Sequence, residues 1–354
     1  MKPMTFAAFA LAVGLAAAPV AHAGPGPLVY IPTGDSAEVL IIDASTNLPI
    51  GRVTGLPAAH GLAVTPDGSR LIVGSYDERP CCAALPEKPA EVSAADHAAH
   101  HVAKPEAAAQ PSVSTVSIVD TATRAIVRRI DVPGAVHHVA VSPDGRTAAV
   151  THPNANGITA IDLETLSVVA TVETGTLPNY AAFSPDGAAL YVSVAGDNAV
   201  AVLDAVTWTV QSRIATGASP EHLVLSPDGS RLFVNNVDDG TVSVIDPSKG
   251  RAVESLAIGS TLHGLDLSAD GGTLFVAVRD DDRLVAVDLG DGSRRSVALS
   301  PAPYHLSVIA GTGVLYVSSA EEPVVWVIDA ATLETRAEIP VTGIGHQFAQ
   351  VSGR

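Results

Sequence analysis

Residues 181–217 read AAFSPDGAALYVSVAGDNAVAVLDAVTWTVQSRIATG and contain four short apolar segments separated by turns. Valine, leucine and tyrosine alternate with small or polar residues inside the segments, whereas proline, aspartate, asparagine and glycine separate them. This alternation is typical of half-buried antiparallel strands. Four such strands within about 40 residues predict one blade of a β-propeller.

The same unit recurs at a nearly constant spacing. The Asp-Gly turn of residues 181–217 lies at Asp186, and its counterparts Asp144, Asp228 and Asp270 lie at steps of 42 residues. The aspartate that closes the third strand recurs at Asp120, Asp162, Asp204, Asp246, Asp288 and Asp329, at steps of 42 residues until a final step of 41. The fold class is therefore all-β, built from repeated four-stranded antiparallel blades.

The two ends of the chain supply the remaining blade. Six copies carry an Asp-Gly or related turn, and residues 347–351 add one further inner strand without a blade of its own. Residues 28–55 provide three strands, LVYIPT, EVLIID and LPIGRVTG, that lack an inner strand. We expect the C-terminal strand to join the N-terminal strands and close a seven-bladed ring, which removes the exposed strand edge.

The repeat resembles that of the bacterial and archaeal β-propellers built from YVTN repeats. The stretches that carry the resemblance are LAVTPDGSRLIVGS (62–75), FSPDGAALYVSVAGDNAVAVLD (183–204), LSPDGSRLFVNNVDDGTVSVID (225–246) and VVWVIDAATLETRAEI (324–339). The resemblance implies a seven-bladed propeller. It implies no single function, because proteins of this family include surface proteins, nucleic-acid binders and cofactor-bearing relatives.

The first 23 residues have the form of a secretory signal peptide. Lys2 precedes an apolar stretch from Phe6 to Val20, and the small residues Ala21 and Ala23 mark a cleavage site after Ala23. The apolar stretch is too short for a membrane span. We therefore expect an exported, periplasmic protein without a membrane span, in which residues 24–354 form a single β-propeller domain.

The charge of the chain restricts its partners. The formal net charge is −17, from 20 basic and 37 acidic residues. Nucleic-acid affinity depends largely on lysine and arginine that neutralise phosphates, so nucleic acid is excluded as an expected partner. A strongly negative protein attracts cations instead.

Seven of the twelve histidines occupy one place in the repeat, just before the inner strand. They are His60, His137, His138, His222, His263, His305 and His346. The inner strands surround the central channel of a propeller, so these side chains are expected to meet at the channel mouth. Neutral imidazole is a good ligand for copper, zinc, nickel and iron. The sequence thus predicts a transition-metal site with copper favoured over zinc.

The histidines fall into two neighbouring columns of the repeat. His60, His137, His263 and His346 share one column, and the other three share the next. Because neighbouring strand residues point to opposite sides, a centre of three or four ligands is expected rather than one of seven.

An insertion of 35 residues at about 78–112 interrupts the period between two blades. It contains Cys81, Cys82, His97, His100 and His101. On a helix His97 and His101 would share a face, and the two thiolates would favour copper(I) or zinc. Strand direction places this insertion on the histidine face, so it adds five candidate metal ligands.

Two other classes of function stay open. The histidines could be polar residues of a wet channel in a scaffold that binds a periplasmic protein partner on the same face. The chain could also be a lactonase-like hydrolase or a cofactor-bearing oxidoreductase. No nucleophile elbow, phosphate loop or haem-attachment motif is present, so no catalytic residue is predicted and the question of enzymatic activity stays open.

Overall fold

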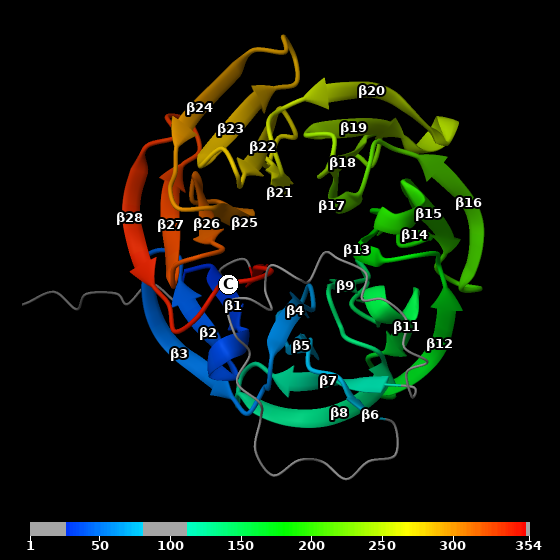
Figure 1. The fold of residues 1–354 in the computed structure, drawn as a ribbon. Coiled ribbons are helices and arrows are strands. Elements are labelled where there is room, and N and C mark those ends of the chain that lie inside the picture. The colour runs from blue at the N-terminus through cyan, green and yellow to red at the C-terminus, as the bar shows by residue number, and fades with distance from the viewer. Residues whose placement is uncertain (1–25, 81–111, 352–354) are drawn as a thin grey trace, which may run out of the picture.

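The computed structural model describes residues 26–80 and 112–351, which form seven sheets around a central axis (Figure 1). Six sheets have four strands, and the seventh has four strands and one short additional strand. Neighbouring strands within each sheet pair in antiparallel fashion, as Ala189 and Asp204 illustrate at one end of such a pair. The predicted all-β, seven-bladed propeller is confirmed.

Each blade runs from the axis to the rim. The innermost strands are β29 (Ala349–Val351), β4 (Ala59–Val64), β9 (Val139–Val141), β13 (Pro178–Phe183), β17 (Pro220–Leu225), β21 (Leu262–Leu267) and β25 (Pro303–Ile309). The second strands are β1 (Leu28–Thr33), β5 (Arg70–Ser75), β10 (Thr147–His152), β14 (Ala189–Val194), β18 (Leu232–Asn236), β22 (Thr273–Val278) and β26 (Val314–Ser319).

The third and fourth strands complete the blades. The third strands are β2 (Glu38–Asp43), β7 (Ser112–Asp120), β11 (Gly157–Asp162), β15 (Ala199–Asp204), β19 (Thr241–Asp246), β23 (Arg283–Asp288) and β27 (Val324–Asp329). The outermost strands are β3 (Leu48–Thr54), β8 (Ala125–Pro133), β12 (Ser167–Glu173), β16 (Thr209–Ala215), β20 (Arg251–Ala257), β24 (Arg294–Ala298) and β28 (Thr335–Pro340). The additional strand β6 (Arg79–Pro80) pairs with the start of β7.

In the described parts of the chain, short turns connect consecutive strands. Within the described residues, four single-turn 3-10 helices occur, η1 (Gly34–Ser36), η2 (Pro153–Ala155), η3 (Ala195–Asp197) and η4 (Pro247–Lys249). No helix in the described part of the chain is long and apolar enough to cross a membrane.

The Asp-Gly turns that define the repeat have a common hydrogen-bond pattern. In the copy at 184–189, the Ser184 hydroxyl and the Ala188 amide both donate to Oδ1 of Asp186, at 2.5 and 3.0 Å. Gly187 follows with a φ of +71°, a conformation that glycine adopts without strain. These hydrogen bonds lower the pKa of the Asp186 carboxyl. The aspartates of these turns are therefore structural, which explains their regular spacing.

The ring closes as expected. β29 pairs with β1 through Leu28 and Val351, Val29 and Gln350, and Tyr30 and Ala349. In Figure 1 the red C-terminal segment accordingly meets the blue N-terminal sheet near the axis. The first blade thus takes its inner strand from one end of the chain and its other three strands from the other end.

Apolar side chains between adjacent blades form the core. At the junction of the first and last blades, Val29, Ile31, Tyr316, Val325 and Val327 are fully buried. Burial of a valine or isoleucine side chain contributes about 1.5–3 kcal/mol. Such clusters recur around the ring, so the blades hold the hub in place from several sides.

Candidate metal centre

The start of each inner strand delivers two consecutive residues to the hub. In β4, the pairing register with the second strand shifts between Ala59 and Leu62, so His60 and Gly61 stand outside the regular ladder. The same shift occurs at the start of β13, β17, β21 and β25. Residues outside a regular ladder do not have to point alternately to opposite sides.

The two glycines among these residues are required by close packing. A Cβ atom on Gly264 would lie 2.6 Å from both the Leu306 nitrogen and the Tyr304 oxygen, and a Cβ on Gly61 would lie 2.6 Å from the His137 oxygen. The contacted atoms belong to the backbone and cannot move aside cheaply. Glycine therefore allows neighbouring inner strands to approach where the histidines gather.

All seven histidines of the repeat are buried at the hub, with no more than 4% of their surface exposed. They are His60, His137, His138, His222, His263, His305 and His346. Their rings contact one another or intervening tyrosines around the axis. His346 stacks on His60 with ring centroids 4.1 Å apart, and His138 stacks on Tyr180 at 3.4 Å. The predicted convergence on the hub is thus what the structure shows.

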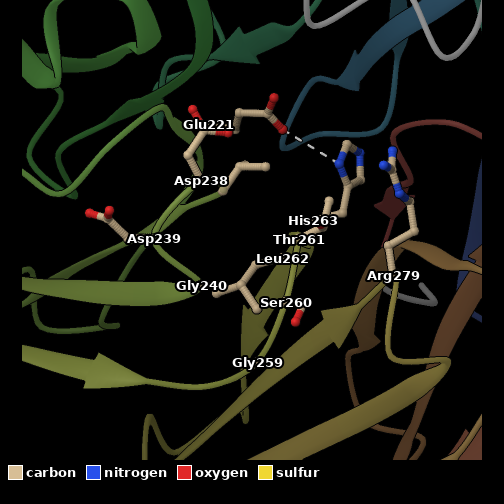
Figure 2. Close-up of a pocket in the computed structure, with 11 residues that line it drawn as sticks. Glu221, Asp238, Asp239, Gly240, Gly259, Ser260, Thr261, Leu262, His263 and Arg279 are labelled. Atoms are coloured by element: carbon tan, nitrogen blue, oxygen red, sulfur yellow. Dashed lines mark ion pairs between the residues drawn. The ribbon is translucent and has the colours of Figure 1, made fainter.

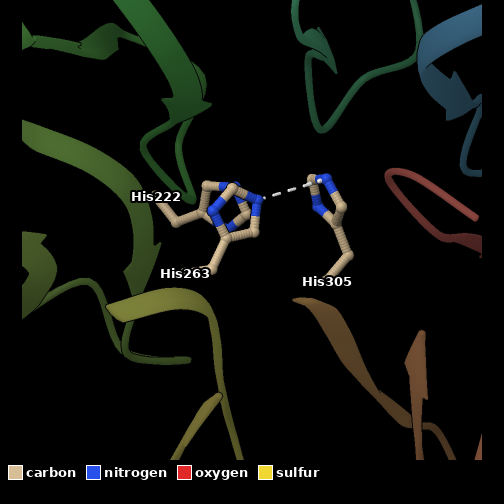
Figure 3. Close-up of side chains that lie close together, drawn as sticks. All are labelled: His222, His263 and His305. Atoms are coloured by element: carbon tan, nitrogen blue, oxygen red, sulfur yellow. Dashed lines mark hydrogen bonds between the residues drawn. The ribbon is translucent and has the colours of Figure 1, made fainter. Parts of the chain in front are cut away.

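Three of these histidines bring ligand atoms together from adjacent blades. One ring nitrogen from each of His222, His263 and His305 lies within 4.8 Å of the others (Figure 3). Nε2 of His263 is 3.4 Å from Nε2 of His305. Two nitrogens bound at about 2.0–2.1 Å to one tetrahedral ion stand roughly 3.3–3.4 Å apart. The pair therefore has the separation of two ligands of one ion, and without an ion the same two nitrogens form a hydrogen bond between the rings.

His222 supplies a further indication of a ligand. Its Nε2 atom is buried and has no hydrogen-bond partner among the described residues. A buried polar atom without a partner costs about 1–3 kcal/mol. Coordination to an ion shared with His263 and His305 would satisfy this atom.

Burial keeps rings of this cluster in the neutral form that binds metals. Burial lowers the pKa of His222 and of His305 well below the ordinary histidine value, and the neighbouring His263 lowers both further. A neutral imidazole keeps one nitrogen lone pair for a ligand bond. The environment therefore favours the coordinating form near neutral pH.

The expected separation of the two histidine columns does not hold for this cluster. His263 belongs to one column, whereas His222 and His305 belong to the other. The centroid of the His263 ring nevertheless lies 4.4 Å from that of His222 and 4.7 Å from that of His305. The register shift at the strand starts explains the difference, because strict alternation applies only within a regular ladder. Three histidines are close enough to hold one ion, and three is the lower of the two ligand numbers expected from the sequence.

His60, His137 and His346 form a second group in the hub, contributed by the first three blades. Nδ1 of His60 lies 2.9 Å from the backbone oxygen of His137, and Nδ1 of His137 lies 3.0 Å from that of Asn179. A carbonyl oxygen only accepts, so both Nδ1 atoms carry their proton. The rings of His60 and His137 are 4.9 Å apart by centroid, and no described histidine of this group joins the cluster of three.

His138 has the opposite proton arrangement. Its Nδ1 accepts a hydrogen bond of 3.2 Å from the Ala181 amide. In the neutral ring Nε2 must then carry the proton. The geometry thus leaves His138 without a lone pair for an ion while this hydrogen bond persists.

Three hub residues were not predicted from the sequence. Glu221, Tyr180 and Tyr304 occupy the same two columns as the histidines, in the copies EHLVLSPDG, NYAAFSPDG and YHLSVIAGTG. Tyr304 stacks on His263 with ring centroids 3.8 Å apart and an interplanar angle of 10°. Reading whole columns of the repeat, rather than the histidines alone, would have identified all three.

A pocket leads to the cluster from the space between the fifth and sixth blades (Figure 2). Its volume is about 540 Å³, and Glu221, His263, Asp238, Asp239 and Arg279 are among the residues that line it. Oε2 of Glu221 lies 3.5 Å from Nδ1 of His263. One histidine of the cluster is therefore reachable from an acidic pocket.

Five candidate ligands of the insertion, Cys81, Cys82, His97, His100 and His101, lie outside the described residues. The insertion departs after β6 and returns at the start of β7. Tyr76, which precedes β6, has its ring centroid 4.9 Å from that of His60. The insertion leaves and re-enters the blade at its third strand, where Pro80 pairs with Ser112. The predicted signal peptide, residues 1–23, also lies outside the described residues.

His152 is buried near this face but has a structural role. Its Nδ1 lies 3.2 Å from the Ala135 oxygen and its Nε2 lies 2.9 Å from the Thr159 hydroxyl. Both ring nitrogens are thus engaged. Desolvation by burial lowers the pKa of His152 to about 4, against an ordinary value of 6.5.

This shift predicts a pH dependence of stability. Between pH 6.5 and about 4 the unfolded chain binds a proton at residue 152 that the folded chain does not, so stability is lost as the pH falls. The loss amounts to about 3 kcal/mol. In His152→Gln, which keeps a donor and an acceptor, urea unfolding at pH 7 and pH 4.5 should show a correspondingly smaller difference. Equal pH differences in the two proteins would contradict the assignment.

Comparison with known proteins agrees with the fold. The YNCE-like beta-propeller family matches residues 181–256. Together with the seven-bladed ring, this match confirms the resemblance to YVTN-type propellers. No curated protein sequence matches the chain.

Solved structures share the architecture at low identity. The hydrazine synthase of Kuenenia stuttgartiensis is 20% identical, with a TM-score of 0.64 over 81% of this chain and 88% of that one. Dihydro-heme d1 dehydrogenase NirN is 17% identical, with a TM-score of 0.63 over 92% of this chain and 66% of that one. A functionally unknown protein from Desulfotomaculum acetoxidans is 13% identical, with a TM-score of 0.71 over 92% and 99%. These likenesses show the fold alone.

Proposed function

We propose that this propeller binds one transition-metal ion, with copper favoured over zinc, through His222, His263 and His305 in its hub. The observation that carries the proposal is the convergence of three buried ring nitrogens within 4.8 Å of one another. Three imidazoles leave a fourth position for water or another ligand. Among divalent ions, copper binds most tightly to a given set of nitrogen ligands.

The role that fits this site is metal binding or handling in the periplasm. The signal-like residues 1–23 support export, and the net charge of −17 favours cations in general. The pocket that His263 lines supports access of an ion to the cluster, and its lining residue Asp238, whose carboxylate accepts from the Ser219 hydroxyl, takes no part in binding. The scaffold hypothesis, in which the same face binds a protein partner without metal, predicts that no ion is bound.

Metal loading of the purified protein tests the proposal directly. The metal-free protein is incubated with copper(II) or zinc, passed through a desalting column and analysed for bound metal. We expect about one equivalent of copper, and X-ray absorption spectra dominated by imidazole nitrogen at about 2.0 Å. Less than a tenth of an equivalent of either metal would contradict metal binding and favour the scaffold hypothesis.

A further inference from the structure

Glu221 occupies a hub position that is histidine in four other blades. Its counterparts in the repeat are His60, His137, His263 and His346. The Glu221 side chain is only 4% exposed, and its Oε2 lies 3.5 Å from Nδ1 of His263, whose side chain is 3% exposed (Figure 2). A carboxylate is costly to bury unless a partner stabilises it. The closeness of the two groups in the hub therefore calls for an explanation.

The contact between Glu221 and His263 bears on which nitrogen of His263 can bind an ion. With the proton of the His263 ring on Nδ1, that N–H faces the carboxylate of Glu221, which can accept a hydrogen bond. The lone pair is then on Nε2, the atom that lies 3.4 Å from Nε2 of His305. The stacked Tyr304 ring restricts rotation of the imidazole plane. Proton and ring orientation thus both favour coordination through Nε2.

We propose that Glu221 is a positioning residue, which accepts a hydrogen bond from Nδ1–H of His263 and so directs the Nε2 lone pair of that histidine toward the metal. The inference rests on the proposed function, because it assigns a role at the same centre. Histidines that bind metals commonly donate their second ring N–H to a carboxylate or carbonyl, and loss of that partner weakens metal binding about 10–100-fold.

One contact of Glu221 does not depend on its carboxylate. The hydroxyl of Ser193 donates to the backbone oxygen of Glu221, a contact that does not involve the carboxylate. Asp238 provides a matched control because it lines the same pocket and carries the same charge. Its carboxylate accepts from the Ser219 hydroxyl instead of from a histidine.

The first measurement needs no metal. In the full-length protein labelled with ¹⁵N-histidine, NMR spectra that correlate ring nitrogens with ring protons report the tautomer of each histidine. We expect the Nδ1–H form for His263 in the wild type and in Asp238→Asn, and a mixture of tautomers in Glu221→Ala. An unchanged tautomer in Glu221→Ala would overturn the inference, whether or not copper binds.

The second measurement uses copper(II) and a competing chelator. We expect Glu221→Ala to raise the dissociation constant about 10–100-fold, the isosteric Glu221→Gln to raise it less, and Asp238→Asn to leave it within about twofold. The copper electron paramagnetic resonance spectrum should change in both Glu221 variants and not in Asp238→Asn. Should the wild type bind no copper, the proposed function fails. If both Glu221 variants bind copper with the affinity and the spectrum of the wild type, the proposed role of Glu221 is overturned and the proposed function stands.

Discussion

Replacing His222, His263 and His305 together by alanine is expected to reduce copper affinity by more than about 1,000-fold. Binding free energies of metal ions in protein sites are on the order of 10 kcal/mol, and this variant removes all three proposed protein ligands. Isothermal titration with copper(II), or competition with a coloured chelator, measures the loss. Circular dichroism of the metal-free variant establishes that the propeller still folds.

The matched control replaces His60, His137 and His346, which are equally buried in the same hub. That variant loses as many imidazoles and leaves a comparable cavity, but it keeps the cluster of three. We expect its copper affinity to stay within about tenfold of the wild type, because no proposed ligand is removed. A larger loss in the control than in the first variant would locate the metal at the other group of histidines and contradict the proposed ligand set.

The architecture was predictable because each blade repeats the same local signals. The stretches 189–194 and 199–204 coincide with β14 and β15, since strand alternation and turn chemistry indicate the same limits. The joining of β29 to β1 was predictable for a different reason. The three N-terminal strands lacked an inner strand, and the C-terminal segment had an inner strand without a blade of its own.

The geometry of the centre was less predictable than its location. The column of histidines indicated the hub, but strand alternation alone separated His263 from His222 and His305. The register shift that brings them together arises where adjacent inner strands approach closely, as at Gly264, which is a property of the packed ring. The proton position on His138 likewise depends on a backbone amide of the next blade, which no local pattern specifies.

The column of the repeat that contains His138, His222 and His305 also contains Gln347, on which we expect ring closure to depend. Gln347 lies just before β29, and its side chain reaches across the hub to two other blades. Its Oε1 accepts from the Leu62 amide at 3.0 Å and from the Val139 amide at 3.4 Å, and its Nε2 donates to the Val139 oxygen at 3.0 Å. The side chain therefore fastens the C-terminal segment to blades beyond the one it completes.

Replacing Gln347 by alanine is expected to destabilise the protein by about 3 kcal/mol or more. Gln347 is 8% exposed, so water cannot readily replace its three hydrogen bonds, and each buried group that loses its partner costs about 1–3 kcal/mol. β29 pairs with β1 through only three residues, which leaves the closure dependent on such additional contacts. Urea unfolding measures the change in the free energy of unfolding.

Gln350→Ala is the control. Gln350 also hydrogen-bonds to another blade, but its side chain is partly exposed, so we expect its replacement to lower the free energy of unfolding by less than about 1 kcal/mol. Equal losses in the two variants would show that the hub contacts of Gln347 are not what closes the ring.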